Sequence, residues 1–162
     1  MSSALDGLRQ VVDALNPRTM SRLVGAGAFT LRSPLGLAKA MPWLVGRGPS
    51  LGIVSQINAV VVGDKVAIHD RAGSITWSEL DAEANRAGRA LLAAGVKPGD
   101  KIALLLRNGR EMAAVALGGQ KTGIIVCPLN TWAKTKELKA VMANLDTSLL
   151  IYDANHYEQV RE

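Results

Sequence analysis

The stretch Lys101-Ile102-Ala103-Leu104-Leu105-Leu106 decides the fold, because an unbroken apolar run here lies between a turn and a polar loop. Such a run predicts a strand that is covered on both faces, as in parallel sheets. Shorter apolar runs follow at Ile124–Cys127 and Ser148–Tyr152. Apolar residues at helical spacing fill the intervals Arg110–Lys121 and Thr135–Leu145. The region therefore predicts strand, helix, strand, helix and strand in that order.

This order predicts an α/β fold with an open, mostly parallel sheet and helices on its faces. Each helical interval is long enough for a right-handed crossover between parallel strands. Asn108 is a suitable N-cap for the helix that follows it, and Gly123 is suited to ending that helix. Pro128 is expected to close the second strand, because proline cannot donate to the hydrogen-bond ladder.

The preceding residues predict a helix and a hairpin. Leu51–Val62 has apolar residues at helical spacing, which predicts a helix. Val66–Ile68 and Ser74–Thr76 are expected as short strands, joined by the turn Asp70–Gly73.

Thr76 and Glu79 predict the start of a second helix, since T-x-x-E is the capping-box pattern. Gly95 is expected to end this helix, and Gly99 and Asp100 lie in the turn that leads to the first buried strand. The predicted buried stripe of the helix consists of Leu80, Ala84, Ala87, Leu91 and Leu92.

Residues 1–50 differ from the rest and are predicted to form a mainly helical, basic and apolar N-terminal extension. This segment holds four of the chain's six prolines, which break it into short pieces. Two interpretations remain open. The segment either packs against its own domain, or residues 17–50 contact an anionic membrane surface from the cytoplasmic side. We place the domain boundary at residue 50, with the α/β part over residues 51–162.

The bulk composition is that of a globular domain. The 162 residues are 48% hydrophobic and 20% charged, which excludes an intrinsically disordered chain. The net charge is +5, but residues 1–50 alone hold six basic and two acidic side chains. These basic residues are spaced singly rather than clustered with aromatic residues, so we expect no nucleic-acid partner.

Reactive side chains are sparse. Cys127 is the only cysteine, so no intrachain disulfide can form, which fits a reducing cytoplasm. His69 and His156 each stand alone, away from any metal-ligand spacing. The longest uncharged stretch of the first third, Leu23–Leu31, is far shorter than the roughly 20 residues that span a bilayer. We expect a cytoplasmic chain with no catalytic residue and no metal site of its own.

The sequence Gly118-Gly119-Gln120-Lys121-Thr122 is only superficially similar to a nucleoside-triphosphate loop. That pattern needs glycine immediately before Lys-Thr and a second glycine five positions earlier. Gln120 and Val115 occupy those two places. The segment also lies at the predicted end of a helix, whereas anions bind at helix N-termini. We therefore expect no phosphate site here.

Thr76-Trp77-Ser78-Glu79-Leu80 and Lys121–Asn130 resemble the first two signatures of the adenylate-forming (AMP-binding) enzymes. The Pro-Leu-Asn ending of the second stretch is more similar to fatty-acyl-CoA ligases than to peptide-synthetase modules. The positions that match the family pattern in order and spacing are Thr76, Glu79, Asn85, Gly99, Asp100, Asn108, Gly123, Pro128 and Asn130. Gly88 and Gly119-Gln120 depart from that pattern, and Gly88 is expected to weaken its helix by ~1 kcal/mol relative to alanine.

The resemblance implies an N-terminal fragment of a fatty-acid–CoA ligase (long-chain acyl-CoA synthetase). Such an enzyme activates a fatty acid with ATP to an acyl-adenylate and then forms the thioester with coenzyme A. In the family a phosphate loop follows the two signatures, and this sequence reaches Glu162 without one. The resemblance thus implies ATP, Mg²⁺ and coenzyme A for the complete enzyme. We expect the chain alone to bind none of them and to be inactive.

The matching positions are accordingly expected to be structural. Asn130 and Trp132 are the exception, because open α/β sheets bind ligands at the carboxyl ends of their strands. We assign them to the rim of an acyl pocket. Three alternatives stay open beside the fragment hypothesis: a split ligase whose remaining domains act in trans, a non-enzymatic binding module, and a truncated gene product.

Overall fold

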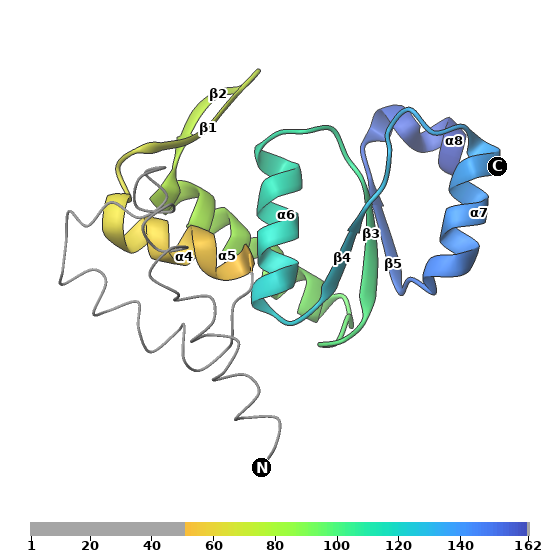
Figure 1. Cartoon of the computed structure of the whole chain (residues 1–162), viewed down its shortest axis with the longest axis horizontal. Helices are drawn as coiled ribbons and strands as arrows, with labels where there is room; N and C mark the ends of the chain where they lie inside the picture. The colour runs from red at the N-terminus through yellow and green to blue at the C-terminus, as the bar shows by residue number, and fades with distance from the viewer. Residues whose placement is uncertain (1–50, 162) are drawn as a thin grey trace, which may run out of the picture.

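The computed structural model describes residues 51–161 and shows the predicted α/β architecture (Figure 1). The predicted extension over residues 1–50, with its membrane interpretation, lies outside the described residues. The elements in chain order are α4 (Leu51–Val62), β1 (Val66–Asp70), β2 (Gly73–Thr76), α5 (Trp77–Ala93), β3 (Lys101–Leu105), α6 (Arg110–Lys121), β4 (Ile125–Pro128), α7 (Thr135–Leu145), β5 (Leu149–Tyr152), a 3-10 turn η1 (Ala154–His156) and α8 (Tyr157–Arg161).

Strands β3, β4 and β5 form a three-stranded parallel sheet in the order β4-β3-β5. The first strand in the sequence is therefore the central one. Leu104 of β3 faces Pro128 on one side and Ile151 on the other. Four of the five residues of β3 are completely buried or nearly so, as its apolar sequence predicts.

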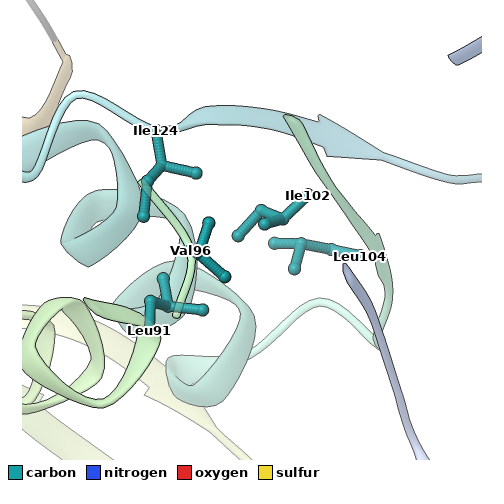
Figure 2. Packing of buried hydrophobic residues seen from close by; sticks show 5 residues of the cluster. All are labelled: Leu91, Val96, Ile102, Leu104 and Ile124. Atoms are coloured by element: carbon teal, nitrogen blue, oxygen red, sulfur yellow. The ribbon is translucent and has the colours of Figure 1, made fainter. Parts of the chain in front are cut away.

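Helices cover both faces of this sheet (Figure 1). Helix α6 lies against one face with α5 and α4 behind it, and α7 and α8 lie on the opposite side. The main core cluster joins α5, the turn after it, β3 and the residue before β4 (Figure 2). Its buried members are Leu91, Val96, Ile102, Leu104 and Ile124.

The hairpin β1–β2 is a separate antiparallel pair. Gly73 adopts a φ of 109°, which a residue with a side chain rarely adopts, so the predicted turn depends on this glycine. Ile75 of the hairpin is buried against Leu80 of α5 and Ala114 of α6. This second cluster fixes the hairpin to the helical layer.

Helices α5 and α6 approach each other closely where Gly88 faces Gly118. A Cβ added to Gly88 would lie 2.8 Å from the carbonyl oxygen of Gly118, and one added to Gly118 would lie 2.3 Å from that of Ala84. Both distances are shorter than van der Waals contact allows. Gly88 therefore has a packing role. The sequence alone predicted only that this glycine weakens its helix.

Several side chains that were predicted to be inward are exposed. Ile125 of β4 is 49% exposed because β4 is an edge strand, and Cys127 on the same strand is only partly buried. Leu92 and Val141 are each 43% exposed. Helical spacing predicts Leu138, Val141 and Met142 to face inward, and α7 fully buries only Leu138 among them.

Within the described part of the chain, no helix has both the length and the apolar character that crossing a bilayer requires.

Candidate functional site

The carboxyl ends of the three parallel strands open into one groove. The loops after β3, β4 and β5 meet there, as expected for an open parallel sheet. Two adjoining hollows, with volumes of about 610 and 720 Å³, share Arg71, Leu106, Arg107 and Asn108 as lining residues. We call this combined hollow the carboxyl-edge groove.

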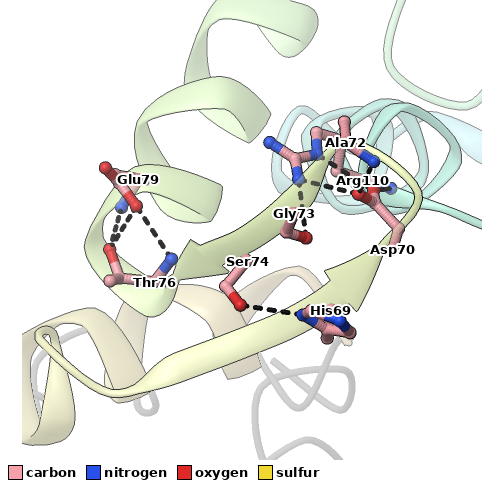
Figure 3. Close-up of polar contacts among 8 residues, drawn as sticks. All are labelled: His69, Asp70, Ala72, Gly73, Ser74, Thr76, Glu79 and Arg110. Atoms are coloured by element: carbon pink, nitrogen blue, oxygen red, sulfur yellow. Dashed lines mark hydrogen bonds and ion pairs between the residues drawn. The ribbon is translucent and has the colours of Figure 1, made fainter.

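One wall of the groove is held by Asp70, at the end of β1. Its two carboxylate oxygens accept hydrogen bonds from Arg110 Nε at 2.9 Å and Nη2 at 2.7 Å (Figure 3). Arg110 Nη2 also donates to the carbonyl of Gly73 at 2.9 Å. The side-chain hydrogen bond from Arg110 holds the pKa of Asp70 well below its usual range. Asp70 is therefore a carboxylate at any physiological pH.

Asp70 also caps α6, a role that was predicted for Asn108. The N-cap position is Gly109, which supplies no side-chain cap. The backbone N–H of Arg110 instead donates to Asp70 Oδ2 at 3.1 Å. A negative charge is favourable at this position because the amino end of a helix carries partial positive charge. The Asn108 prediction was wrong because the cap comes from a distant strand.

The groove has two further arginines. Arg71 is exposed and forms no ion pair within the described residues. Arg107 Nε lies 3.8 Å from Asp153 Oδ2, with its own side chain 56% exposed, so the pair is weak. Asp153 is oriented mainly by Asn155, whose backbone N–H donates to it at 3.0 Å and whose hydrogen bond lowers the pKa of Asp153. Both arginines are thus available to an anionic ligand.

Asn130 and Trp132, the predicted rim residues, both line this groove. Asn130 Oδ1 accepts a hydrogen bond from the backbone N–H of Trp132 at 3.0 Å, which is an Asx-turn. Asn130 therefore shapes the loop after β4, and Trp132 extends from that loop with 91% of its surface exposed.

His156 lines the same groove from η1. Its Nδ1 lies 3.0 Å from Gln159 Oε1, whereas its Nε2 is buried and has no hydrogen-bond partner among the described residues. The sequence prediction of an isolated surface or core histidine did not place it at the groove.

Other signature positions form local contacts at helix ends and turns. Thr76 and Glu79 form the predicted capping box: Glu79 Oε2 accepts from Thr76 N at 2.9 Å, and Thr76 Oγ1 accepts from Glu79 N at 3.3 Å (Figure 3). Gly99 and Gly123 adopt positive φ in the turns before β3 and β4. Asp100 Oδ2 accepts from Lys97 N at 2.8 Å, which closes the first of these turns.

Asn85 and Lys121 belong to a polar cluster between three helices. Lys121 Nζ donates to Asp81 Oδ1 and, at 2.9 Å, to Asn85 Oδ1. Ser55 of α4 is fully buried and donates to the same Asp81 oxygen at 2.9 Å. The side chains of Lys121 and Asp81 are 10% and 15% exposed. Lys121 is therefore held within this cluster by Asp81 and Asn85.

The described residues contain no preformed cluster of metal ligands. In residues 51–161 no three His, Cys, Asp or Glu side chains come together as metal ligands. Of the carboxylates that line the groove, Asp70 is paired with Arg110, Asp153 lies in a weak pair with Arg107, and Glu111 is exposed. We therefore derive no chemical step through a metal at this groove.

Comparison with known proteins identifies the family. The family model described as "AMP-binding enzyme" matches residues 56–162, which is more than half of the chain. The chain belongs to the AMP-binding enzyme family. The resemblance carried by Thr76–Leu80 and Lys121–Asn130 is thereby confirmed, as is an adenylate-forming fold.

The curated relatives of this AMP-binding family member include CoA ligases that are named for different acid substrates. The medium/long-chain-fatty-acid–CoA ligase FadD6 of Mycobacterium tuberculosis is 31% identical over 133 residues, covering 80% of this chain and 22% of that protein. The 3-hydroxybenzoate–CoA ligase of Aromatoleum sp. is 33% identical over 93 residues, covering 57% of this chain and 18% of that protein. The chain thus spans about a fifth of the length of these relatives.

Solved structures of the AMP-binding family show the same architecture. The crystal structure of the N-terminal domain of FACL13 from Mycobacterium tuberculosis superimposes with a TM-score of 0.67 at 25% identity. The superposition covers 70% of this chain and 29% of that one. The α/β elements described above accordingly match part of the N-terminal domain of FACL13.

Arg71, Arg107 and Asp70 are groove residues that the sequence analysis did not single out. A signal was present for Arg107, since it follows a buried strand directly and so lies at the carboxyl edge of a parallel sheet. Asp70 and Arg71 reach the groove because the hairpin packs on α6. Local sequence patterns do not predict this packing.

Proposed function

We propose that this chain forms the first part of the N-terminal domain of a fatty-acid–CoA ligase. The complete enzyme would join a fatty acid to ATP as an acyl-adenylate and then transfer the acyl group to coenzyme A. Residues 51–162 would act as its partial α/β subdomain, and the membership of the AMP-binding family supports this role.

The observation that carries the fatty-acid assignment is the extent of the match to FadD6. That match covers 80% of this chain, which is more than residues 56–162 can supply. It therefore extends into the residues before Gln56. The two hydroxybenzoate–CoA ligases match 57% and 67% of this chain, and the fatty-acid ligase FadD13 matches 49%. The match to FadD6 is the longest of these four, and its extent supports the fatty-acid assignment.

The carboxyl-edge groove supports the same assignment chemically. It combines cationic groups, Arg71 and Arg107, with an apolar side. The apolar lining consists of Leu106, Met112, Pro128, Leu129 and Trp132. A fatty acid has the matching character, with one carboxylate and a long apolar chain. We propose that Asn130 and Trp132 lie at the rim of the acyl site and that the arginines face the anionic end of a ligand.

We expect the isolated 162 residues to be inactive. Lys121 is engaged with Asp81, and the sequence holds no glycine-, serine- and threonine-rich phosphate loop. ATP activation needs groups that hold the phosphates and stabilise the charge that develops on them. ATP, Mg²⁺ and coenzyme A are thus assigned to the complete enzyme and not to this segment alone.

The test begins with the intact mass of the native polypeptide, detected in its own cells through peptides of residues 66–153. ATP–pyrophosphate exchange is then measured with a fatty acid or 3-hydroxybenzoate, using the native polypeptide and the purified 162-residue chain. We expect exchange with the fatty acid in a native polypeptide much larger than 17.1 kDa, and no exchange in the short chain. A preference for 3-hydroxybenzoate would overturn the substrate assignment, and exchange by the short chain would overturn its predicted inactivity.

In a second arrangement, another polypeptide supplies the remaining ligase domains. The unpaired edge strands of the sheet favour this arrangement. β4 and β5 are edge strands within the described sheet, and Ile125 on β4 is half exposed. Unpaired edges and exposed apolar side chains are surfaces on which another segment packs. A native mass near 17.1 kDa together with co-purification of an ATP-binding polypeptide would select this arrangement.

A further inference from the structure

The loop between β3 and α6 contains the dipeptide Asn108-Gly109 at the carboxyl-edge groove. Asn108 is exposed and lines both hollows of the groove, and Gly109 lines one of them. The two residues form a bend that belongs to neither the strand nor the helix. Asparagine is chemically labile, most of all before glycine, because glycine has no Cβ to shield its backbone nitrogen. The dipeptide is therefore a candidate site of covalent change.

The fold holds neither of the two groups that would react. Within residues 51–161, the side-chain amide of Asn108 forms no hydrogen bond, and the backbone N–H of Gly109 donates to no acceptor. The next backbone N–H, that of Arg110, is bound by Asp70 Oδ2 at 3.1 Å. The nitrogen of Gly109 thus lies just outside the hydrogen-bonded part of α6.

Four other described asparagines have their side chains bound and precede residues other than glycine. They are Asn85, Asn130, Asn144 and Asn155. The amide of Asn144, for example, donates to the carbonyl of Ala140 at 2.9 Å within α7. A bound amide must break its hydrogen bond before its Cγ can turn toward the backbone. Asn108 differs from these four in both respects.

We propose that Asn108 is a site of spontaneous deamidation through a succinimide. The backbone nitrogen of Gly109 loses its proton and forms a bond to Cγ of Asn108, while the bond from Cγ to Nδ2 breaks and ammonia leaves. A water molecule then opens the ring. Cleavage between Cγ and the nitrogen gives aspartate, whereas cleavage between the main-chain carbonyl carbon and the nitrogen gives isoaspartate. Water is the only other reactant.

The fold does not require glycine at position 109, which makes this route testable. The φ of Gly109 is 172°, an extended conformation that any residue adopts. A Cβ added to Gly109 would lie 3.4 Å from Glu111 Oε2 and 3.6 Å from Asp70 Oδ2, which are ordinary contact distances. Gly109→Ala should therefore keep the fold, while its methyl group hinders the approach of the nitrogen to Cγ.

The reaction adds a negative charge to the carboxyl-edge groove, since a carboxylate replaces a neutral amide. The charge lies next to Arg107 in the sequence and just before α6, where the amino end of the helix favours it. The groove already contains the carboxylates of Asp70, Glu111 and Asp153. A further carboxylate should weaken the binding of an anionic ligand. That consequence rests on the proposed ligase function, whereas the reaction itself does not.

The test is incubation of the full 162-residue chain in mildly alkaline buffer, followed by cleavage after lysine and mass spectrometry. Such cleavage yields a peptide of residues 102–121, in which Asn108 is the only asparagine. Deamidation is read from the mass change when –OH replaces –NH₂, and isoaspartate from labelling by protein isoaspartyl methyltransferase. The parent unfolded in guanidinium chloride is the reference.

Two variants separate the roles of the glycine and of the free side chain. Gly109→Ala removes the glycine, and the matched control Thr131→Gly gives the bound Asn130 a glycine neighbour. Circular dichroism confirms that each is folded, and the comparison of folded with unfolded parent needs neither variant.

We expect Asn108 to deamidate in the folded chain about as fast as in the unfolded chain, mainly to isoaspartate, while the four bound asparagines stay intact. Gly109→Ala should slow the reaction severalfold, and Asn130 in Thr131→Gly should react more slowly than Asn108. A folded chain that stays intact at Asn108 while the unfolded chain reacts would overturn the proposal. Undiminished reaction in Gly109→Ala would rule out the succinimide route. Equal reaction of Asn130 and Asn108 in Thr131→Gly would overturn the role of the free side chain. Each outcome is independent of the ligase assignment.

Discussion

Asp70 and Arg110 lie forty residues apart in the sequence and meet through three hydrogen bonds. The carboxylate of Asp70 binds both the guanidinium and the backbone N–H of Arg110, so one side chain fixes the hairpin and also caps α6. The pair stands beside the carboxyl-edge groove, which Asp70 lines. The wall of the candidate site therefore depends on a contact between two elements that are distant in the chain.

This contact predicts a pH dependence of stability. The pKa of Asp70 is lowered in the folded protein by Arg110, and the pKa of Glu79 is lowered by its hydrogen bonds with Thr76. The unfolded values are about 3.9 for Asp and 4.3 for Glu. The unfolded chain therefore binds more protons in acid, so the stabilisation is complete above about pH 5 and is lost as the pH falls below about 4. Urea midpoints measured between pH 3 and 7 should show this fall.

Asp70→Asn should remove part of that dependence. We expect a lower urea midpoint at pH 7 and a shallower fall in acid, because the variant no longer releases a proton on folding. Asp64→Asn, in the exposed turn before β1, removes the same charge and serves as the control. An acid slope identical to that of the parent would contradict the assignment to Asp70.

Lys121→Met is expected to destabilise the fold by about 3 kcal/mol, because it leaves the largely buried carboxylate of Asp81 without its cation. The double variant Asp81→Asn/Lys121→Met should recover much of this loss, since no charge then remains uncompensated. Chemical denaturation of the parent, the single variants and the double variant measures the coupling. Lys97→Met, at an exposed turn position, is the control for loss of a lysine. Additive losses would show that the two groups do not stabilise each other.

Gly88→Ala is expected to lower the free energy of unfolding by about 1–3 kcal/mol, although alanine is the better helix former by ~1 kcal/mol. The added methyl group would lie 2.8 Å from the carbonyl of Gly118, so the two helices must separate. Arg89→Ala, at the next and exposed position, should change stability by less than about 0.5 kcal/mol. A stabilised Gly88→Ala variant would mean that helix propensity outweighs the close packing.

Lys134→Ser is expected to stabilise the fold by about 0.5–1.5 kcal/mol through α7. Glu137 already accepts from the backbone N–H of Lys134, but a lysine side chain has no acceptor for the return hydrogen bond, so only half of a capping box exists. Serine supplies that acceptor. Lys136→Ser, within the same helix, removes a lysine without adding a cap and should give no gain. Thermal unfolding of both variants provides the comparison.

The sequence was sufficient for the elements and for their order in the chain. The predicted helices Leu51–Val62, Arg110–Lys121 and Thr135–Leu145 have the observed bounds, because periodicity and local breakers define them. The capping box at Thr76 was predictable for the same reason, since both partners lie within one helical turn. The parallel sheet followed from the alternation of strands and helices.

Contacts between distant elements could not be predicted in this way. Asn108 fitted the local preference for a cap, but Asp70 reaches α6 through the fold of the hairpin. Local helix propensity makes Gly88 unfavourable, and only its close approach to Gly118 on another helix explains why glycine fits there. The burial of Ile125 was also overestimated, because the local sequence does not indicate whether a strand lies at the edge of the sheet.

The central place of β3 bears on the order in which the chain assembles. Lys101 pairs with Ile125 and Ile102 pairs with Leu149, so no rung of this sheet closes until at least one intervening helix has been synthesised. The hairpin and the capped helix α5 involve only near neighbours and can form earlier. Non-local pairing of this kind is slow. The most deeply buried strand thus emerges first among the sheet strands, before its partners are available. Aggregation therefore competes most strongly with folding in the interval before β4 and β5 are synthesised.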